Sequence, residues 1–270
     1  MTGKTHSVTE AQTILPPITD PTVHGDIDRL VARYLDAGGI GMDLLTAIGG
    51  KAETLLDRLP AVVRKRMDKI TLGALNRAFD AATRSRRMVG DRGEWFNRLL
   101  STASGAAGGL AGLPGALIEM PLTVTLLLRA IMEIAVEHGF DPDSEDVRVE
   151  ALRIFATAGP LEEDDGTDLG LLAARLSITG QTVQGLITKV APKLSISLGQ
   201  KVAAQATPIL GAAAGATINY TFARYYQELA RVHFGLMRLS VETGLPRAAL
   251  GEAFELRVNQ IREARKAARR

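Results

Sequence analysis

The chain has 270 residues and a formal net charge of +2, and 46% of its residues are hydrophobic, which is ample for a sizeable core. It contains no cysteine, so disulfides, thiolate catalysis, iron–sulfur clusters and cysteine-based zinc sites are excluded. Ala, Leu, Val and Ile dominate the apolar residues and aromatic residues make up only 4%, a composition that favours helices over sheets.

The first half of the chain reads as a series of helices after a loose N-terminal segment. Residues 1–24 are predicted to be disordered, and they lack the apolar region of a signal peptide. Helical periodicity begins near Asp26. The expected helices run from Asp26 to a break at Gly38-Gly39 and Gly41, from Met42 to Leu59, from Ala61 to Met88 with a break near Leu72-Gly73, and onward from an N-cap at Asp91.

Two long stretches then carry almost no charge. Glu119 is the only charged residue between Arg98 and Arg129, and there is none between Lys201 and Arg224. Glycines recur three or four residues apart in both stretches, at Gly105, Gly108, Gly109, Gly112, Gly115, Gly211 and Gly215. Each interior glycine costs a helix about 0.8–1 kcal/mol relative to alanine, so these glycines indicate close helix packing or contact with lipid.

The balance for membrane insertion of the first stretch is near zero. The nine Leu, Ile and Val residues of Leu110 to Leu128 favour insertion by roughly 3–5 kcal/mol. A charged Glu119 offsets most of this, and Pro114 and Pro121 weaken the helix further. A re-entrant hairpin, interfacial association and a buried core hairpin therefore all stay open.

The second half is also predicted to be helical. One helix is expected from Pro121 to a C-cap at Gly139, and the next from a cap at Asp143 or Ser144 to Ala158. An acidic loop at 162–168 follows, then a helix from Leu169 towards Thr188 and a new helix start at Pro192. A further helix runs from Tyr220 to Val241 and is ended by Gly244-Leu245-Pro246, and the last helix runs from Arg247 to a basic tail. We predict an all-α, compact bundle with the glycine-rich apolar helices packed centrally. Residues 25–245 form the main domain, and residues 246–270 form a C-terminal amphipathic helix.

Polar residues within the apolar stretches are the candidate site. A buried Glu119 requires a partner, for which Arg129, Lys201 and His233 are the candidates. Asn219 and His233 lie on one helix face, with Tyr226 between them, and with Glu119 they would form a polar site or a structural network. No HExxH, P-loop or EF-hand pattern occurs, so no metal or cofactor is expected.

Two regions carry a family resemblance. The first runs from Gly108-Gly109-Leu110 through Glu119-Met120-Pro121 to Ile134-Ala135, and the second from Gln200-Lys201 through Pro208 to Arg238. Their order and spacing resemble the EcsC family, over roughly Leu55 to Glu242. One departure is that the family usually has Asp-Leu-Pro where this chain has Glu119-Met120-Pro121.

The resemblance implies a bacterial, membrane-associated protein, because the family is named for a component encoded beside an ABC transporter linked to the export of proteins. It implies no reaction and no catalytic residues. We therefore expect a non-enzymatic accessory protein, cytoplasmic and either peripheral or hairpin-inserted at the inner face of the cell membrane. Its expected partners are membrane lipids or a membrane protein such as a transporter, and not nucleic acid. A hydrolase-type enzyme and a soluble carrier of an apolar ligand, each with a site around Glu119, Asn219 and His233, are the alternatives.

Overall fold

The computed structural model describes residues 18–47, 55–89, 94–110, 112–157, 159–161, 182–205 and 211–268. Within these ranges all regular structure is helical and packed into one bundle, which confirms the predicted class. The elements are α1 (Pro21–Ala47), the 3-10 helix η1 (Leu56–Arg58), α3 (Ala61–Arg64), α4 (Met67–Val89), α5 (Glu94–Leu110), α6 (Gly112–Glu137), α7 (Glu145–Phe155), α9 (Val183–Gln205), α10 (Gly211–Thr243) and α11 (Arg247–Ala268).

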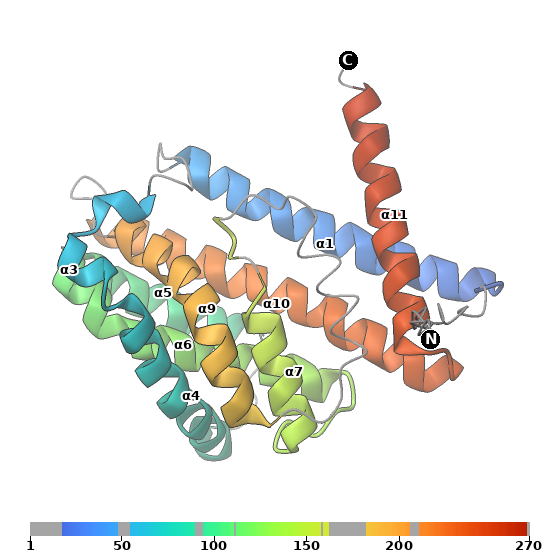
Figure 1. The fold of residues 1–270 in the computed structure, drawn as a ribbon, viewed down its shortest axis with the longest axis horizontal. Coiled ribbons are helices and arrows are strands. Elements are labelled where there is room, and N and C mark those ends of the chain that lie inside the picture. Colours follow the sequence, from blue (N-terminus) through green and yellow to red (C-terminus); the bar gives the residue numbers. More distant parts are fainter. Residues whose placement is uncertain are drawn as a thin grey trace, which may run out of the picture.

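The long helix α10 organises the bundle (Figure 1). The hairpin of α5 and α6 packs against its first half, and α1 lies along its second half. On the other side of α6, α4 and α9 complete the core, while α11 contacts α1 and extends away at its C-terminal end. The glycine-rich first turns of α10 and the glycine-rich end of α5 therefore meet inside the bundle.

Several helix ends follow the predicted capping chemistry. Gly139 has a φ of 84°, and Phe140 N–H donates to the carbonyl of Ala135 at 2.9 Å, which closes α6 in a Schellman motif. The Ser144 hydroxyl accepts from Val147 N–H at 3.3 Å and caps α7. Gly244, with a φ of 71°, ends α10. These three predictions are confirmed.

Both interior prolines were wrongly predicted to open helices. Pro121 lies inside α6 and Pro192 inside α9, nine residues after the start of each helix. Both side chains face solvent, where the carbonyl left without an N–H donor can bind water. Most residues of each helix are buried, so the packing of many apolar side chains outweighs one missing hydrogen bond.

Glycine was also overrated as a helix breaker. α1 begins at Pro21, five residues before the predicted start, and continues through Gly38, Gly39 and Gly41. Glycine lowers helix propensity without forbidding helical angles, and the buried face of α1 is anchored on α10 and α11. The break predicted near Leu72-Gly73 lies instead at Lys65-Arg66, between α3 and α4. Asp91 and the 162–168 loop lie outside the described residues.

Among the described helices, only α6 is long and apolar enough to cross a membrane. However, 67% of its most apolar window is buried against the protein's own helices. The segment from Gly105 to Gly115 is a helical hairpin whose turn includes Gly112, with a φ of 59°. In this structure the apolar hairpin therefore contributes most of its surface to the core.

Candidate functional site

Glu119 lies at the centre of a buried polar cluster, with only 7% of its surface exposed. Lys201 Nζ lies 3.4 and 3.3 Å from its two carboxylate oxygens. Asn219 Nδ2 donates to Oε1 at 2.6 Å, and Gln205 Nε2 donates to Oε2 at 3.0 Å. The hydroxyl of Thr123 donates to the same carboxylate. Five groups thus compensate for the removal of this charge from water, once the hydroxyl of Ser104 at 3.2 Å is included.

The cluster joins four helices that are distant in sequence. Ser104 comes from α5, Glu119 from α6, Lys201 from α9 and Asn219 from α10. Asn219 Nδ2 also donates to the carbonyl of Ser101 at 2.8 Å, which ties α10 to the backbone of α5. The cluster therefore fixes the relative positions of all four helices at this end of the bundle.

Two glycines of α5 make this convergence possible. A Cβ added at Gly108 would lie 2.7 Å from Oε2 of Glu119. A Cβ added at Gly105 would lie 2.7 Å from Cβ of Asn219 and still closer to the carbonyl oxygen of Gly215. The predicted small-residue face is thus a packing surface on which α6 and α10 approach the α5 backbone.

The other predicted glycines have less decisive surroundings. Gly115 and Gly215 are buried, and Gly112 forms the turn between α5 and α6. Gly109 lies in α5 and Gly211 lies at the start of α10. The packing around these two glycines is not among the described parts of the structure. Close packing explains Gly105 and Gly108, and turn geometry explains Gly112.

Electrostatically, Glu119 and Lys201 are not equivalent. Burial by itself raises the pKa of Glu119, but Lys201 and the hydrogen bonds from Thr123, Asn219 and Gln205 outweigh it and hold that pKa below its usual value. Burial lowers the pKa of Lys201 to about 8, because the attraction of one carboxylate only partly offsets the loss of water around a fully buried ammonium. The charged form of Glu119 is therefore stabilised by its surroundings, whereas the charged form of Lys201 is destabilised by its burial.

Arg129 lies in a second buried cluster rather than beside Glu119. Its Nε donates to Oδ1 of Asn97 and its Nη1 to the hydroxyl of Ser85, both at 3.0 Å. The side-chain amide of Asn97 donates to Glu133. Ten residues of helix separate Glu119 from Arg129, a rise of about 15 Å, so the two side chains serve different layers of the bundle.

His233 belongs to a third buried cluster, around Glu150. Its Nε2 lies 2.9 Å from Oε2 of Glu150, whose other oxygen, Oε1, pairs with Arg153 at 3.0 Å and Arg247 at 3.7 Å. Asn219 and His233 do share a helix face, but fourteen residues correspond to a rise of about 21 Å. The shared face was a correct inference, whereas the axial distance prevents one common site.

Thus the structure brings together Glu119, Lys201 and Asn219, and it does not bring Arg129 or His233 to them. Sequence reasoning missed Gln205, Thr123, Ser104 and Glu150. Helical spacing gave a signal for two of them, because Thr123 and Gln205 each follow a charged member of the cluster by four residues.

Chemically, the cluster is a saturated ion pair and not an open site. The three cavities described are lined by other residues, none of them from this cluster. Within the described part of the chain, no group of three or more histidine and acidic side chains is arranged to hold a metal ion. The contacts of Glu119, Lys201 and Asn219 compensate their own charge and polar groups, and they fix how the glycine-rich helices meet.

Comparison with known proteins identifies the family of this chain. The family model of the EcsC protein family matches residues 83–239, more than half of the chain. The chain belongs to the EcsC family. The matched segment contains the whole Glu119 cluster, whereas α1 and α11 lie outside it. No curated protein and no solved structure matched the chain.

Proposed function

We propose that this EcsC family protein is a non-enzymatic accessory protein that docks peripherally on the inner face of the cell membrane, next to a membrane protein such as an ABC transporter or export component. The observation that carries the proposal is an uncharged, solvent-exposed surface on α5, α6 and α10. We call it the outer face. It is formed by the exposed residues Leu99, Ala103, Ala107, Pro114, Ile118, Pro121, Leu122, Ala213, Thr217 and Tyr220.

The outer face contains large apolar side chains that the fold does not use. Ile118 is 81% exposed, Leu122 50% and Leu99 47%. Exposed apolar residues are common singly, but a group of them without an intervening charge indicates an interaction surface. Glu119 is the only charged residue between Arg98 and Arg129, and its side chain points into the buried cluster and not towards the outer face.

The register of the helices supports one continuous surface. α5 contacts α6 where Gly108 meets Glu119, and it contacts α10 where Gly105 meets Asn219. These contacts lie on the inward side of α5, so its exposed residues lie on the opposite side, between the exposed flanks of its two neighbours. The glycine contacts and the Glu119 cluster hold the three helices in this layer.

Basic side chains lie at the same end of the bundle. Met67, at the start of α4, packs near Gly199 of α9, two residues before Lys201. The exposed Lys65 and Arg66 directly precede α4. Near an anionic membrane each such cation contributes about 1 kcal/mol, so this rim supports binding to an acidic lipid surface.

Burial of α6 favours docking over insertion. An inserted hairpin would expose its apolar surface to lipid, whereas the inward side of α6 is packed against the bundle and carries Glu119. Insertion of the hairpin would require separation of α6 from α4, α9 and α10. The hydrolase and carrier alternatives gain no support from the described cavities, since none adjoins Glu119 or His233.

Cell fractionation of the untagged protein tests the proposal. We expect the protein to sediment with membranes at low salt, to be partly released by high salt and to be fully released by alkaline carbonate. High salt weakens only the cationic rim, while carbonate strips peripheral proteins. Recovery of the whole protein in the soluble fraction would overturn membrane association, and retention through carbonate would overturn peripheral docking in favour of an inserted hairpin.

A further inference from the structure

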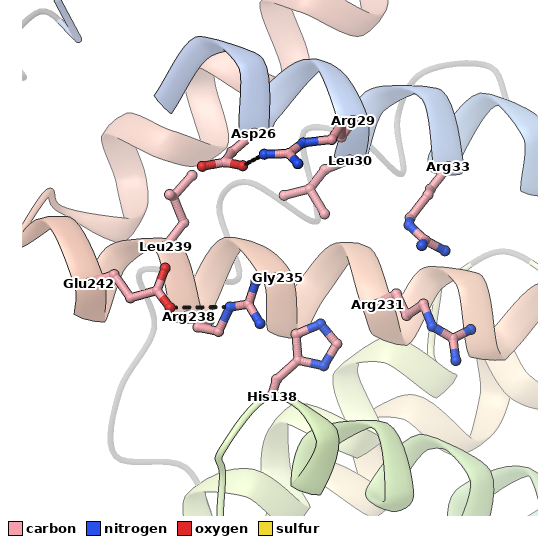
Figure 2. Close-up of a pocket in the computed structure, with 10 residues that line it drawn as sticks. All are labelled: Asp26, Arg29, Leu30, Arg33, His138, Arg231, Gly235, Arg238, Leu239 and Glu242. Carbon is pink, nitrogen blue, oxygen red and sulfur yellow. Dashed lines mark hydrogen bonds and ion pairs between the residues drawn. The ribbon is translucent and has the colours of Figure 1, made fainter. Parts of the chain in front are cut away.

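A groove of about 280 Å³ lies between α1 and α10, far along α10 from the outer face (Figure 2). Its floor is formed where Leu30 packs on Gly235, at a position where an added Cβ would lie 2.7 Å from the leucine. Charged side chains from both helices border it, and His138 reaches it from the turn after α6. The groove therefore forms at a close helix contact lined with polar groups.

The lining is predominantly cationic. Arg29 and Arg33 come from α1, Arg231 and Arg238 from α10, and they are accompanied by only two carboxylates, Asp26 and Glu242. Asp26 pairs with Arg29, and Glu242 lies 3.4 Å from Nε of Arg238, so both carboxylates gather at one end of the groove. With His138 neutral, the lining carries two net positive charges.

At the other end the arginines share a carboxylate that lies outside the lining. Glu228 lies 2.9 Å from Arg33, 3.3 Å from Arg231 and 4.0 Å from Arg98. Glu137 also lies 3.6 Å from Arg231. Each of these three guanidinium groups thus has a carboxylate oxygen within 4.0 Å, and the three gather around Glu228.

Repulsion between these cations adds to the effect of burial on the pKa values of Arg231 and His138. Burial, followed by repulsion from Arg33, lowers the pKa of Arg231 to about 10. Burial also lowers the pKa of His138, and Arg238 and Arg33 lower it further, against a hydrogen bond to the carbonyl of Ile134. Arg33 and Arg238, from facing helices, therefore act on the same point, where a bound anion would relieve the repulsion.

We propose that this groove binds the phosphate group of a small phosphate ester, either a soluble molecule or a lipid headgroup. Guanidinium groups match phosphate through two parallel hydrogen bonds, and Figure 2 shows that Arg33 and Arg238 approach the groove from opposite helices. The volume lies just below the common range of about 300–1,000 Å³ for ligand pockets, so a glycerol phosphate fits better than a nucleotide. This proposal does not depend on the outer face, since a soluble ester can bind whether or not the protein reaches a membrane.

The test is calorimetric titration of the full chain with glycerol 3-phosphate, for the wild type and for Arg33→Gln and Arg238→Gln. Both side chains are about half exposed, at 49% and 52%, so their replacement leaves the core intact. Each variant is expected to bind about tenfold more weakly, because one charge-assisted contact to phosphate is lost. Arg224→Gln, which removes an exposed arginine of the same helix outside the groove, serves as the matched control and should bind like the wild type.

A second arm with vesicles containing phosphatidylglycerol separates the two sources of phosphate. Weaker binding of glycerol 3-phosphate in both variants, with unchanged vesicle binding, assigns the groove to a soluble ester. Weaker vesicle binding in both variants assigns it to a lipid headgroup. The proposal is overturned if neither probe binds, or if both variants bind each probe as tightly as the wild type does.

Discussion

At the scale of single residues, the Glu119–Lys201 pair shows how a buried charge is compensated. Lys201 is fully buried, and its ammonium contacts both oxygens of Glu119, Thr123 at 3.3 Å and Gln205 at 3.0 Å. Such pairs contribute little net stability compared with apolar residues of similar shape, but removal of one partner leaves an uncompensated charge. The pair therefore specifies how the four helices meet more than it adds to the free energy of unfolding.

Substitutions at this pair test that interpretation. Lys201→Met is expected to lower the free energy of unfolding by about 3–5 kcal/mol, because it leaves the Glu119 carboxylate buried without its cation. Adding Glu119→Gln should restore a large part of this loss, since the amide keeps hydrogen bonds with its neighbours without a charge. Urea unfolding of both single variants and the double variant measures the coupling. Additive effects of the two substitutions would contradict a direct interaction.

At the scale of helices, the glycines of α5 determine how closely α6 and α10 can approach. Gly105 faces the backbone of α10, which cannot move aside as a flexible side chain can. Gly73, in the middle of α4, has no neighbouring atom within 4 Å of an added Cβ. The two positions differ in packing and not in secondary structure, so they form a matched pair.

Gly105→Ala is expected to lower the free energy of unfolding by about 2 kcal/mol, because the strain of separating α5 from α10 exceeds the gain in helix propensity. Gly73→Ala should instead raise it by about 0.5–1 kcal/mol through propensity alone. Thermal or urea unfolding of the two variants gives the comparison. A stabilised Gly105→Ala variant would show that the two helices do not meet as described.

The helices also show what the sequence can and cannot predict. Periodicity and capping residues predicted the existence of most helices, and Ser144, Gly139 and Gly244 ended or began them as expected. Pro121 and Pro192 misled the prediction because a local rule gave no weight to the packing of the surrounding helix. Tertiary packing decides whether a helix continues through a proline, and the residues next to that proline in the sequence do not reveal this packing.

The candidate site was predictable only in part for a similar reason. An isolated carboxylate in an apolar stretch indicated that Glu119 is buried and paired, and Lys201 was among its predicted partners. Which cation reaches it depends on the register of α9 against α6, which helical spacing within one element cannot reveal. The same limit applies to His233, whose partner Glu150 comes from α7.

At the scale of the whole molecule, charge is distributed unevenly over the surface. The outer face is uncharged, the start of α4 next to it is basic, and the groove between α1 and α10 is cationic. The buried clusters hold the helices so that the apolar flanks of α5, α6 and α10 stay exposed together. This distribution supports the proposed peripheral attachment to an anionic membrane.

Flotation of the purified protein with phosphatidylglycerol-containing vesicles tests this claim most directly. The double variant Ile118→Glu with Leu122→Glu places two charges on the outer face, while Val241→Glu adds one at an equally exposed apolar residue near the other end of α10, where Val241 is 70% exposed. Each side chain withdrawn from lipid costs about 2 kcal/mol, so the double variant should bind roughly a thousandfold more weakly, with an unchanged melting temperature. Val241→Glu should float like the wild type. Equal flotation of all three proteins would contradict docking through the outer face.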